Sequence, residues 1–129
     1  MARYLLDTTV LIDFLRGRQV IVELLERLAK EGHELGVCAV NIAELYSGLS
    51  PEERRKADRL IDNLRYFDID REAAKLAGSY RYAFARQGRP LSTADTLVAA
   101  AAVMNGAILI TANVKDYPME DLQLLEQPR

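Results

Sequence analysis

The stretch Tyr4-Leu5-Leu6-Asp7-Thr8-Thr9-Val10-Leu11-Ile12-Asp13 begins with apolar residues, passes through an acid and two hydroxyl side chains, and becomes apolar again. Its first part predicts a short buried strand, and the apolar residues after Thr9 predict a helix. Open α/β sheets bind their ligands at the carboxyl ends of parallel strands. Asp7 is therefore a candidate metal ligand, and the alternative is that it simply caps the helix.

The composition is that of an ordinary globular protein. Of the 129 residues, 50% are hydrophobic and 28% are charged, and this length predicts a single domain over residues 1–129 with one core. The formal net charge of −2 excludes a protein that coats nucleic acid non-specifically, because such proteins carry a basic surplus. Contacts with nucleic acid would be local, through a bound cation or through a few arginines. The candidates are Arg16, Arg18, Arg86 and Arg89.

The cysteine content and the hydropathy limit the location of the protein. Cys38 is the single cysteine and stands among apolar residues, so we expect a buried thiol. Together with the single His33 it does not make a zinc site. The longest apolar run, 97–104, is too short to cross a bilayer, and the N-terminus lacks the apolar segment of a signal peptide. We expect a cytoplasmic protein that makes no membrane contact.

Apolar runs alternate with amphipathic segments along the rest of the chain. These runs predict buried strands over 35–40 and 107–110, and shorter strands over 66–69 and 122–125. The helix over 92–104 is apolar nearly all round and should be central. The alternation predicts an α/β fold with three layers, α/β/α, and a mostly parallel central sheet. The expected helix caps are Asn41, Ser50, Asp70 and Ser92.

Four acids occupy related places in this pattern. Asp7 and Asp116 follow strands, whereas Glu44 and Asp95 are expected in the first turns of helices. All these positions lie on one edge of a parallel sheet, so the four carboxylates should converge there. Their repulsion requires a cation, and an all-oxygen ligand set favours Mg²⁺ or Mn²⁺ over zinc. Each acid alone also has a structural alternative as a helix-capping residue.

Hydroxyl side chains accompany these acids. Thr8 and Thr9 follow Asp7 directly, and Thr111 ends the strand that precedes Asp116. A cation held by carboxylates commonly serves phosphate chemistry. The hydroxyls are placed to orient an attacking water or a phosphate beside it.

The acidic segments together resemble the four signature blocks of the PIN domain, in order and across essentially the whole chain. Within that family, the size and the motifs are similar to the VapC-type toxins of prokaryotic toxin–antitoxin pairs. The blocks are Leu5-Leu6-Asp7-Thr8-Thr9-Val10-Leu11-Ile12-Asp13, Asn41-Ile42-Ala43-Glu44-Leu45, Ala94-Asp95-Thr96-Leu97-Val98-Ala99-Ala100 and Thr111-Ala112-Asn113-Val114-Lys115-Asp116-Tyr117.

The resemblance implies an endoribonuclease that uses Mg²⁺ or Mn²⁺ to hydrolyse RNA phosphodiester bonds by attack of water. Carried over by position, Asp7, Glu44 and Asp95 are the metal ligands.

The fourth block leaves two candidates. Some relatives carry an acid where this chain has Asn113, and others carry it three residues later, where this chain has Asp116. We favour Asp116 as the fourth acid because Asn113 contributes no charge, and we assign Thr111 a supporting role.

The resemblance also implies two protein partners. One is a second copy of the chain in a homodimer. The other is a small antitoxin that blocks the acidic crevice. The expected docking surfaces for the antitoxin are the exposed parts of the first two helices and the segment Ser47–Leu64.

The sequence also bears on several other functions. A phosphatase of the haloacid-dehalogenase type needs a second Asp where this chain has Thr9, and a receiver domain needs an acidic pair after its first strand that is missing here. The main alternatives within the family are an RNA-processing or structure-specific nuclease outside a toxin–antitoxin pair, and a non-catalytic binding module with an acidic pocket.

Overall fold

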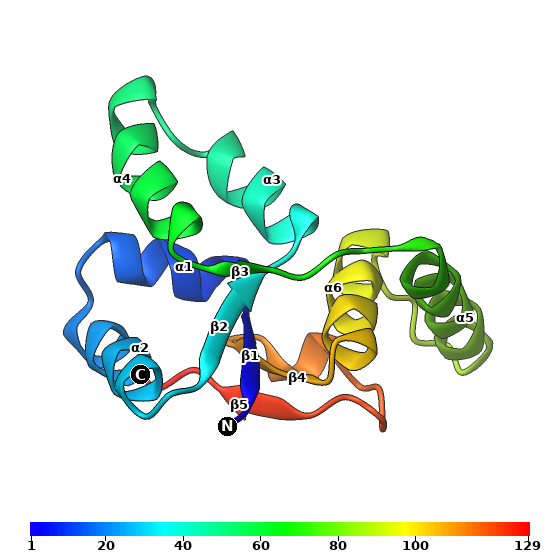
Figure 1. The fold of residues 1–129 in the computed structure, drawn as a ribbon. Helices are drawn as coiled ribbons and strands as arrows, with labels where there is room; N and C mark the ends of the chain where they lie inside the picture. Colours follow the sequence, from blue (N-terminus) through cyan, green and yellow to red (C-terminus); the bar gives the residue numbers. More distant parts are fainter.

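A five-stranded sheet runs through the centre of the computed structural model, which describes residues 1–129 (Figure 1). The strands are β1 (Arg3–Leu6), β2 (Glu34–Val37), β3 (Arg65–Tyr66), β4 (Ala107–Thr111) and β5 (Leu124–Glu126). Their order is β3-β2-β1-β4-β5, and all four neighbouring pairs are parallel. All strands therefore end at the same edge of the sheet.

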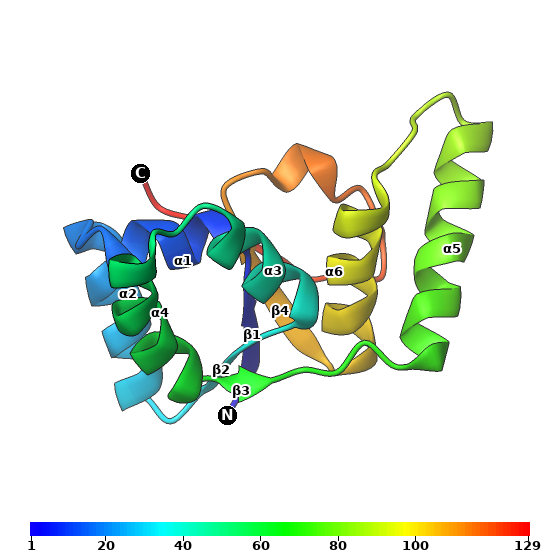
Figure 2. The same ribbon diagram turned by 90° about the horizontal axis from the view of Figure 1, so that it is seen from above.

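α-Helices lie on both sides of this sheet (Figures 1 and 2). They are α1 (Thr8–Leu15), α2 (Gln19–Lys30), α3 (Ala39–Ser47), α4 (Pro51–Asp62), α5 (Arg71–Arg86) and α6 (Thr93–Met104), and a short 3₁₀ helix η1 (Val114–Asp116) follows β4. On one face α6 packs against β4 and α5 packs outside α6; on the other, α1 packs against β4 and α2 against β2. The predicted three-layer α/β fold is confirmed.

The core has one part on each face of the sheet. Leu5 and Leu109 belong to the part under α5 and α6, whereas Leu6 and Ile110 belong to the part under α1, α2 and α4. Successive side chains of a strand point to opposite faces, so a strand buried on both faces reads as an unbroken apolar run. Residues 98–102 of α6 are also fully or nearly fully buried, which confirms the central place predicted for this helix.

Three of the four predicted helix caps are confirmed. The side chain of Ser50 accepts from Glu53 N–H at the start of α4, and Asp70 accepts from Ala73 N–H at the start of α5. The hydroxyl of Ser92 likewise accepts from Asp95 N–H at the start of α6. These contacts satisfy backbone donors that would otherwise be unpaired in the first turn.

The prediction for Asn41 was wrong. Strand β2 ends at Val37, and the residue that caps α3 is Cys38, so Asn41 lies inside the first turn. Its Oδ1 accepts from Cys38 N–H at 3.1 Å, so the amide closes the helix start from within the helix. The earlier start moves Glu44 from the first turn of α3 to the second.

Strand bounds also differ from the predicted ones at the sheet edges. The strand expected over 66–69 is β3, which ends at Tyr66, and the one expected over 122–125 is β5, shifted to 124–126. After β3 the ring of Phe67 packs on Gly36, where an added Cβ would lie 2.6 Å from the ring. A glycine at this position in β2 lets the ring approach the sheet this closely.

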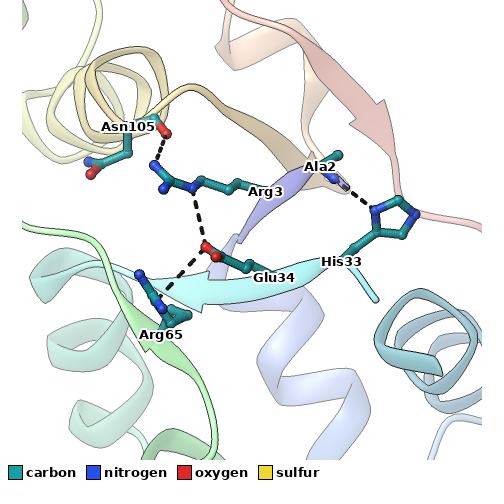
Figure 3. A network of polar contacts seen from close by, with 6 residues as sticks. All are labelled: Ala2, Arg3, His33, Glu34, Arg65 and Asn105. Atoms are coloured by element: carbon teal, nitrogen blue, oxygen red, sulfur yellow. Dashed lines mark hydrogen bonds and ion pairs between the residues drawn. The ribbon is translucent and has the colours of Figure 1, made fainter. Parts of the chain in front are cut away.

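Polar contacts tie the elements together at the amino end of β1, opposite the edge where the strands end (Figure 3). Glu34 Oε2 lies 3.2 Å from Arg3 Nε and 3.9 Å from Arg65 Nε, which joins β2 to both neighbouring strands. Arg3 also donates to the carbonyl of Asn105 after α6, and Ala2 N–H donates to His33 Nδ1. None of the helices is both long and apolar enough to cross a membrane.

Candidate active site

Asp7 lies at the carboxyl end of β1, where it caps α1 and is only 7% exposed. Its Oδ1 accepts from the backbone N–H of Thr8 (2.9 Å) and from the side-chain amide of Asn41 (3.4 Å). Its Oδ2 accepts from the hydroxyls of Thr111 (2.8 Å) and Tyr117 (3.0 Å). A carboxylate has about four acceptor positions, so this carboxylate is fully hydrogen-bonded.

Asp95, in the first turn of α6, faces Asp7 across a single hydroxyl group. The hydroxyl oxygen of Tyr117 lies 3.0 Å from Asp7 Oδ2 and 3.4 Å from Asp95 Oδ1. The ring is buried, with 3% of its surface exposed. Burial, followed by the charges of Asp7 and Asp95, raises the pKa of Tyr117 well above its ordinary value. The phenol therefore stays protonated and acts as a hydrogen-bond donor.

The acid at the end of η1 joins this group through its charge. Burial raises the pKa of the Asp95 carboxyl, and the negative charges of Asp116 and Asp7 act in the same direction. The charges of Asp7 and Asp116 therefore both act on Asp95. Asp7 and Asp95 thus meet at the edge where the parallel strands end, on either side of the Tyr117 hydroxyl.

Glu44 reaches the same edge from the second turn of α3. Its side chain is exposed, and Oε1 accepts a 2.7 Å hydrogen bond from the hydroxyl of Thr8, the residue after Asp7. This contact fixes the carboxylate of Glu44 beside the start of α1.

The two candidates in the fourth block occupy different positions. Asn113 is exposed, and its backbone N–H donates to Thr111 Oγ1 at 3.0 Å, while the Thr111 hydroxyl donates to Asp7. Asn113 thus supports the site through its main chain. Asp116 is the residue of this block whose charge acts on Asp95.

The donor set suits a hard divalent cation. No three carboxylate, thiol or imidazole groups are close enough together to hold a metal ion among them. Mg²⁺, however, is usually held by one or two carboxylates and keeps several waters. Asp7 and Asp95, which lie on either side of one hydroxyl, are such a pair of carboxylates.

Two residues of the site were not identified from the sequence. Asn41 is fully buried and contacts Asp7, Cys38 N–H and the Cys38 thiol. The sequence shows Tyr117 only as the last residue of the fourth block. An amide within an acidic motif and a tyrosine directly after Asp116 were the available signals, but neither residue type by itself indicates contact with a carboxylate.

The candidate phosphate contacts are mostly engaged within the protein. Arg18 pairs with Asp13 at 3.1 Å, Arg86 stacks on the ring of Tyr82, and Arg89 donates to the carbonyl of Lys115. Arg16 lines a groove between α1, α3 and α4 that begins beside Glu44. The groove is lined by Ile12, Leu15, Arg16, Glu44, Leu45, Gly48, Leu49, Glu53 and Lys56.

The chain is similar to known proteins in both sequence and fold. The PIN domain profile matches residues 4–116. Ribonuclease VapC10 of Mycobacterium tuberculosis is 33% identical over 115 residues, which cover 89% of this chain and 86% of that protein. The structure of VapBC2 from Rickettsia felis bound to a promoter DNA fragment superposes with a TM-score of 0.88 at 23% identity, covering 98% and 99% of the two chains. A toxin–antitoxin complex from Klebsiella pneumoniae gives a TM-score of 0.80 at 20% identity, with 98% of each chain covered.

Proposed function

This chain belongs to the PIN domain family, and from that premise we propose that it is a Mg²⁺- or Mn²⁺-dependent endoribonuclease, the toxin of a type II toxin–antitoxin pair. The observation that carries the proposal is the pairing of Asp7 and Asp95 across the Tyr117 hydroxyl at the edge where the strands end, with the charge of Asp116 acting on Asp95. The relative VapC10 is named a ribonuclease, which supports the same activity.

The cation is proposed to bind between Asp7 and Asp95, with Glu44 and Asp116 placed around it. Once bound, it neutralises charge on the scissile phosphate and makes an attacking water more acidic. This assignment explains why Asp7 and Asp95, which come from two separate elements, lie on either side of one hydroxyl despite the repulsion between their charges.

The surrounding residues hold these acids in place. Asn41 and Thr111 each donate to a different oxygen of Asp7, which fixes the plane of its carboxylate. Thr8 holds one oxygen of Glu44 and leaves the other facing solvent. That second oxygen is placed to accept a proton from an attacking water or to bind through a bridging water.

The proposed partners are an antitoxin and a second copy of the chain. The groove between α1, α3 and α4 is lined by apolar side chains together with Arg16, Lys56 and the acids Glu44 and Glu53. An antitoxin segment that followed this groove would lead directly over the acidic edge. Likeness to the Klebsiella pneumoniae toxin–antitoxin complex supports such a partner, and the homodimer rests on the family resemblance.

The test is cleavage of a mixed RNA pool by antitoxin-free protein, with EDTA, Mg²⁺ and Mn²⁺ in parallel. We expect cutting only with a divalent cation and loss of cutting in Asp95→Asn. The matched control is Glu72→Gln, which neutralises an exposed acid of α5 away from the site. Cleavage in EDTA, or equal loss in the control, would contradict the proposal.

A further inference from the structure

The hydroxyl of Tyr117 contacts two carboxylates from different elements, Asp7 after β1 and Asp95 in α6. We propose that this hydroxyl occupies the side of Asp7 that a cation shared with Asp95 must use, so that Tyr117 and the cation compete for Oδ2 of Asp7. The inference rests on the proposed metal site, and it makes Tyr117 a positioning residue that sets how tightly the site binds its metal.

Asp7 offers no free acceptor position. Two donors contact each oxygen of its carboxylate, which is the full capacity of the group. A cation that coordinates Asp7 must therefore replace one of the four donors.

Three of the four donors to Asp7 are fixed by their place in the backbone or by a further hydrogen bond. Thr8 donates through its backbone N–H at the start of α1. The Thr111 hydroxyl accepts from Asn113 N–H, which fixes its direction. Asn41 is fully buried, and its Oδ1 is bonded to the residue before α3.

The fourth donor, Tyr117, differs from the others in two respects. It follows the short helix η1 rather than lying within a strand or long helix. It is also the donor that faces a second carboxylate, at 3.4 Å from Asp95 Oδ1. A hydroxyl carries one proton, so it can donate fully to only one of the two acids, whereas a divalent cation can bind both.

If Tyr117 competes with the cation, removing its hydroxyl should increase the affinity for Mn²⁺. A purely structural role of Tyr117 predicts no such increase. In Tyr117→Phe the competing donor is removed, so Mn²⁺ should bind about tenfold more tightly, the factor expected for one hydrogen bond to a charged group. The same variant should melt at a lower temperature in EDTA, because the repulsion between Asp7 and Asp95 then has no shared donor to offset it.

Tyr80 provides a matched control. It is also a buried tyrosine whose hydroxyl donates to an aspartate, at 2.8 Å from both oxygens of Asp121. Burial, followed by the Asp121 hydrogen bond and charge, raises its pKa as well. Tyr80→Phe should lower the melting temperature but leave the Mn²⁺ affinity unchanged.

The experiment is calorimetric titration of the full chain and of both variants with Mn²⁺, together with melting in EDTA. Tighter binding in Tyr117→Phe alone supports the inference. Unchanged or weaker binding in Tyr117→Phe, with binding by the parent protein intact, overturns the inference and leaves the proposed function standing. Failure of the parent protein to bind Mn²⁺ overturns both.

A second measurement needs no variant. In protein labelled with ¹³C at the tyrosine ζ carbon, a saturating Mg²⁺ titration should shift the Tyr117 resonance and leave that of Tyr80 in place. A Tyr117 resonance that stays fixed while Mg²⁺ saturates the site overturns the inference.

Discussion

The hydroxyl of Thr8 donates a 2.7 Å hydrogen bond to Oε1 of Glu44, and this contact joins the first turn of α1 to the second turn of α3. Glu44 is exposed, so without this bond its side chain would be free to change rotamer. The orientation of the Glu44 carboxylate therefore depends on Thr8, the residue directly after Asp7.

Replacing Thr8 by Val should release Glu44 while keeping the shape of the side chain. We expect the cleavage rate with Mg²⁺ to fall about tenfold, the effect of one hydrogen bond to a charged group, with little change in melting temperature. Thr9→Val is the control, because Thr9 follows in the same turn and makes no side-chain hydrogen bond. Equal rates in the Thr8 and Thr9 variants would remove Thr8 from the site.

Asp95→Asn should make the stability of the protein less dependent on pH. Burial raises the pKa of Asp95 in the folded state. A carboxyl with a raised pKa stabilises the fold fully below its unfolded pKa, and this contribution is lost as pH rises through the folded value. In EDTA at pH 7, the variant should therefore melt a few degrees higher than the parent. Melts repeated down to about pH 3.5 should show the difference shrinking, and a parent that melts higher at pH 7 would contradict the prediction.

The fourth block predicts a ranking of two alanine variants. Asp116 acts on Asp95 through its charge, whereas Asn113 acts on Thr111 through its backbone, which alanine retains. Asp116→Ala should therefore weaken Mn²⁺ binding more than Asn113→Ala does. Calorimetric titration of both variants decides the matter, and the reverse ranking would assign the fourth position to Asn113.

Gly36→Ala should destabilise the edge of the sheet. The added Cβ would lie 2.6 Å from the Phe67 ring and 2.8 Å from the carbonyl of Arg65, and overpacking of this kind costs about 1–3 kcal/mol. Gly78→Ala on α5 is the control, because nothing lies within 4 Å of its added Cβ, and alanine favours a helix by up to about 1 kcal/mol. Urea unfolding of both variants measures the difference.

Much of the architecture could be predicted from local patterns. The unbroken apolar runs around Leu5 and Leu109 indicate strands buried on both faces, and the Ser50-Pro51 start of α4 carries its own capping signal. The motif blocks predicted the family, which the comparison confirms. These features are readable because each depends on neighbours within a few residues.

The contacts that complete the site could not be predicted in this way. Asn41 has the chemistry of a helix cap, and only the end of β2 at Val37 places it inside the helix instead. Tyr117 meets Asp7 across 110 positions, a separation at which no spacing rule applies. The metal-binding roles of the acids stay predictions, and the variants above test them.

The sheet order has a consequence for synthesis. β1 lies between β2 and β4, and Asp7 is 104 positions from Thr111. The ribosome synthesises the first part of the site early: Asp7, Glu44 and the residues that line the groove of α1, α3 and α4. It adds Asp95, β4 and Tyr117 only later. A nascent chain thus contains the residues of its proposed antitoxin groove before it contains those of a complete acidic centre. An antitoxin already present in the cell could meet this toxin before its first catalytic turnover.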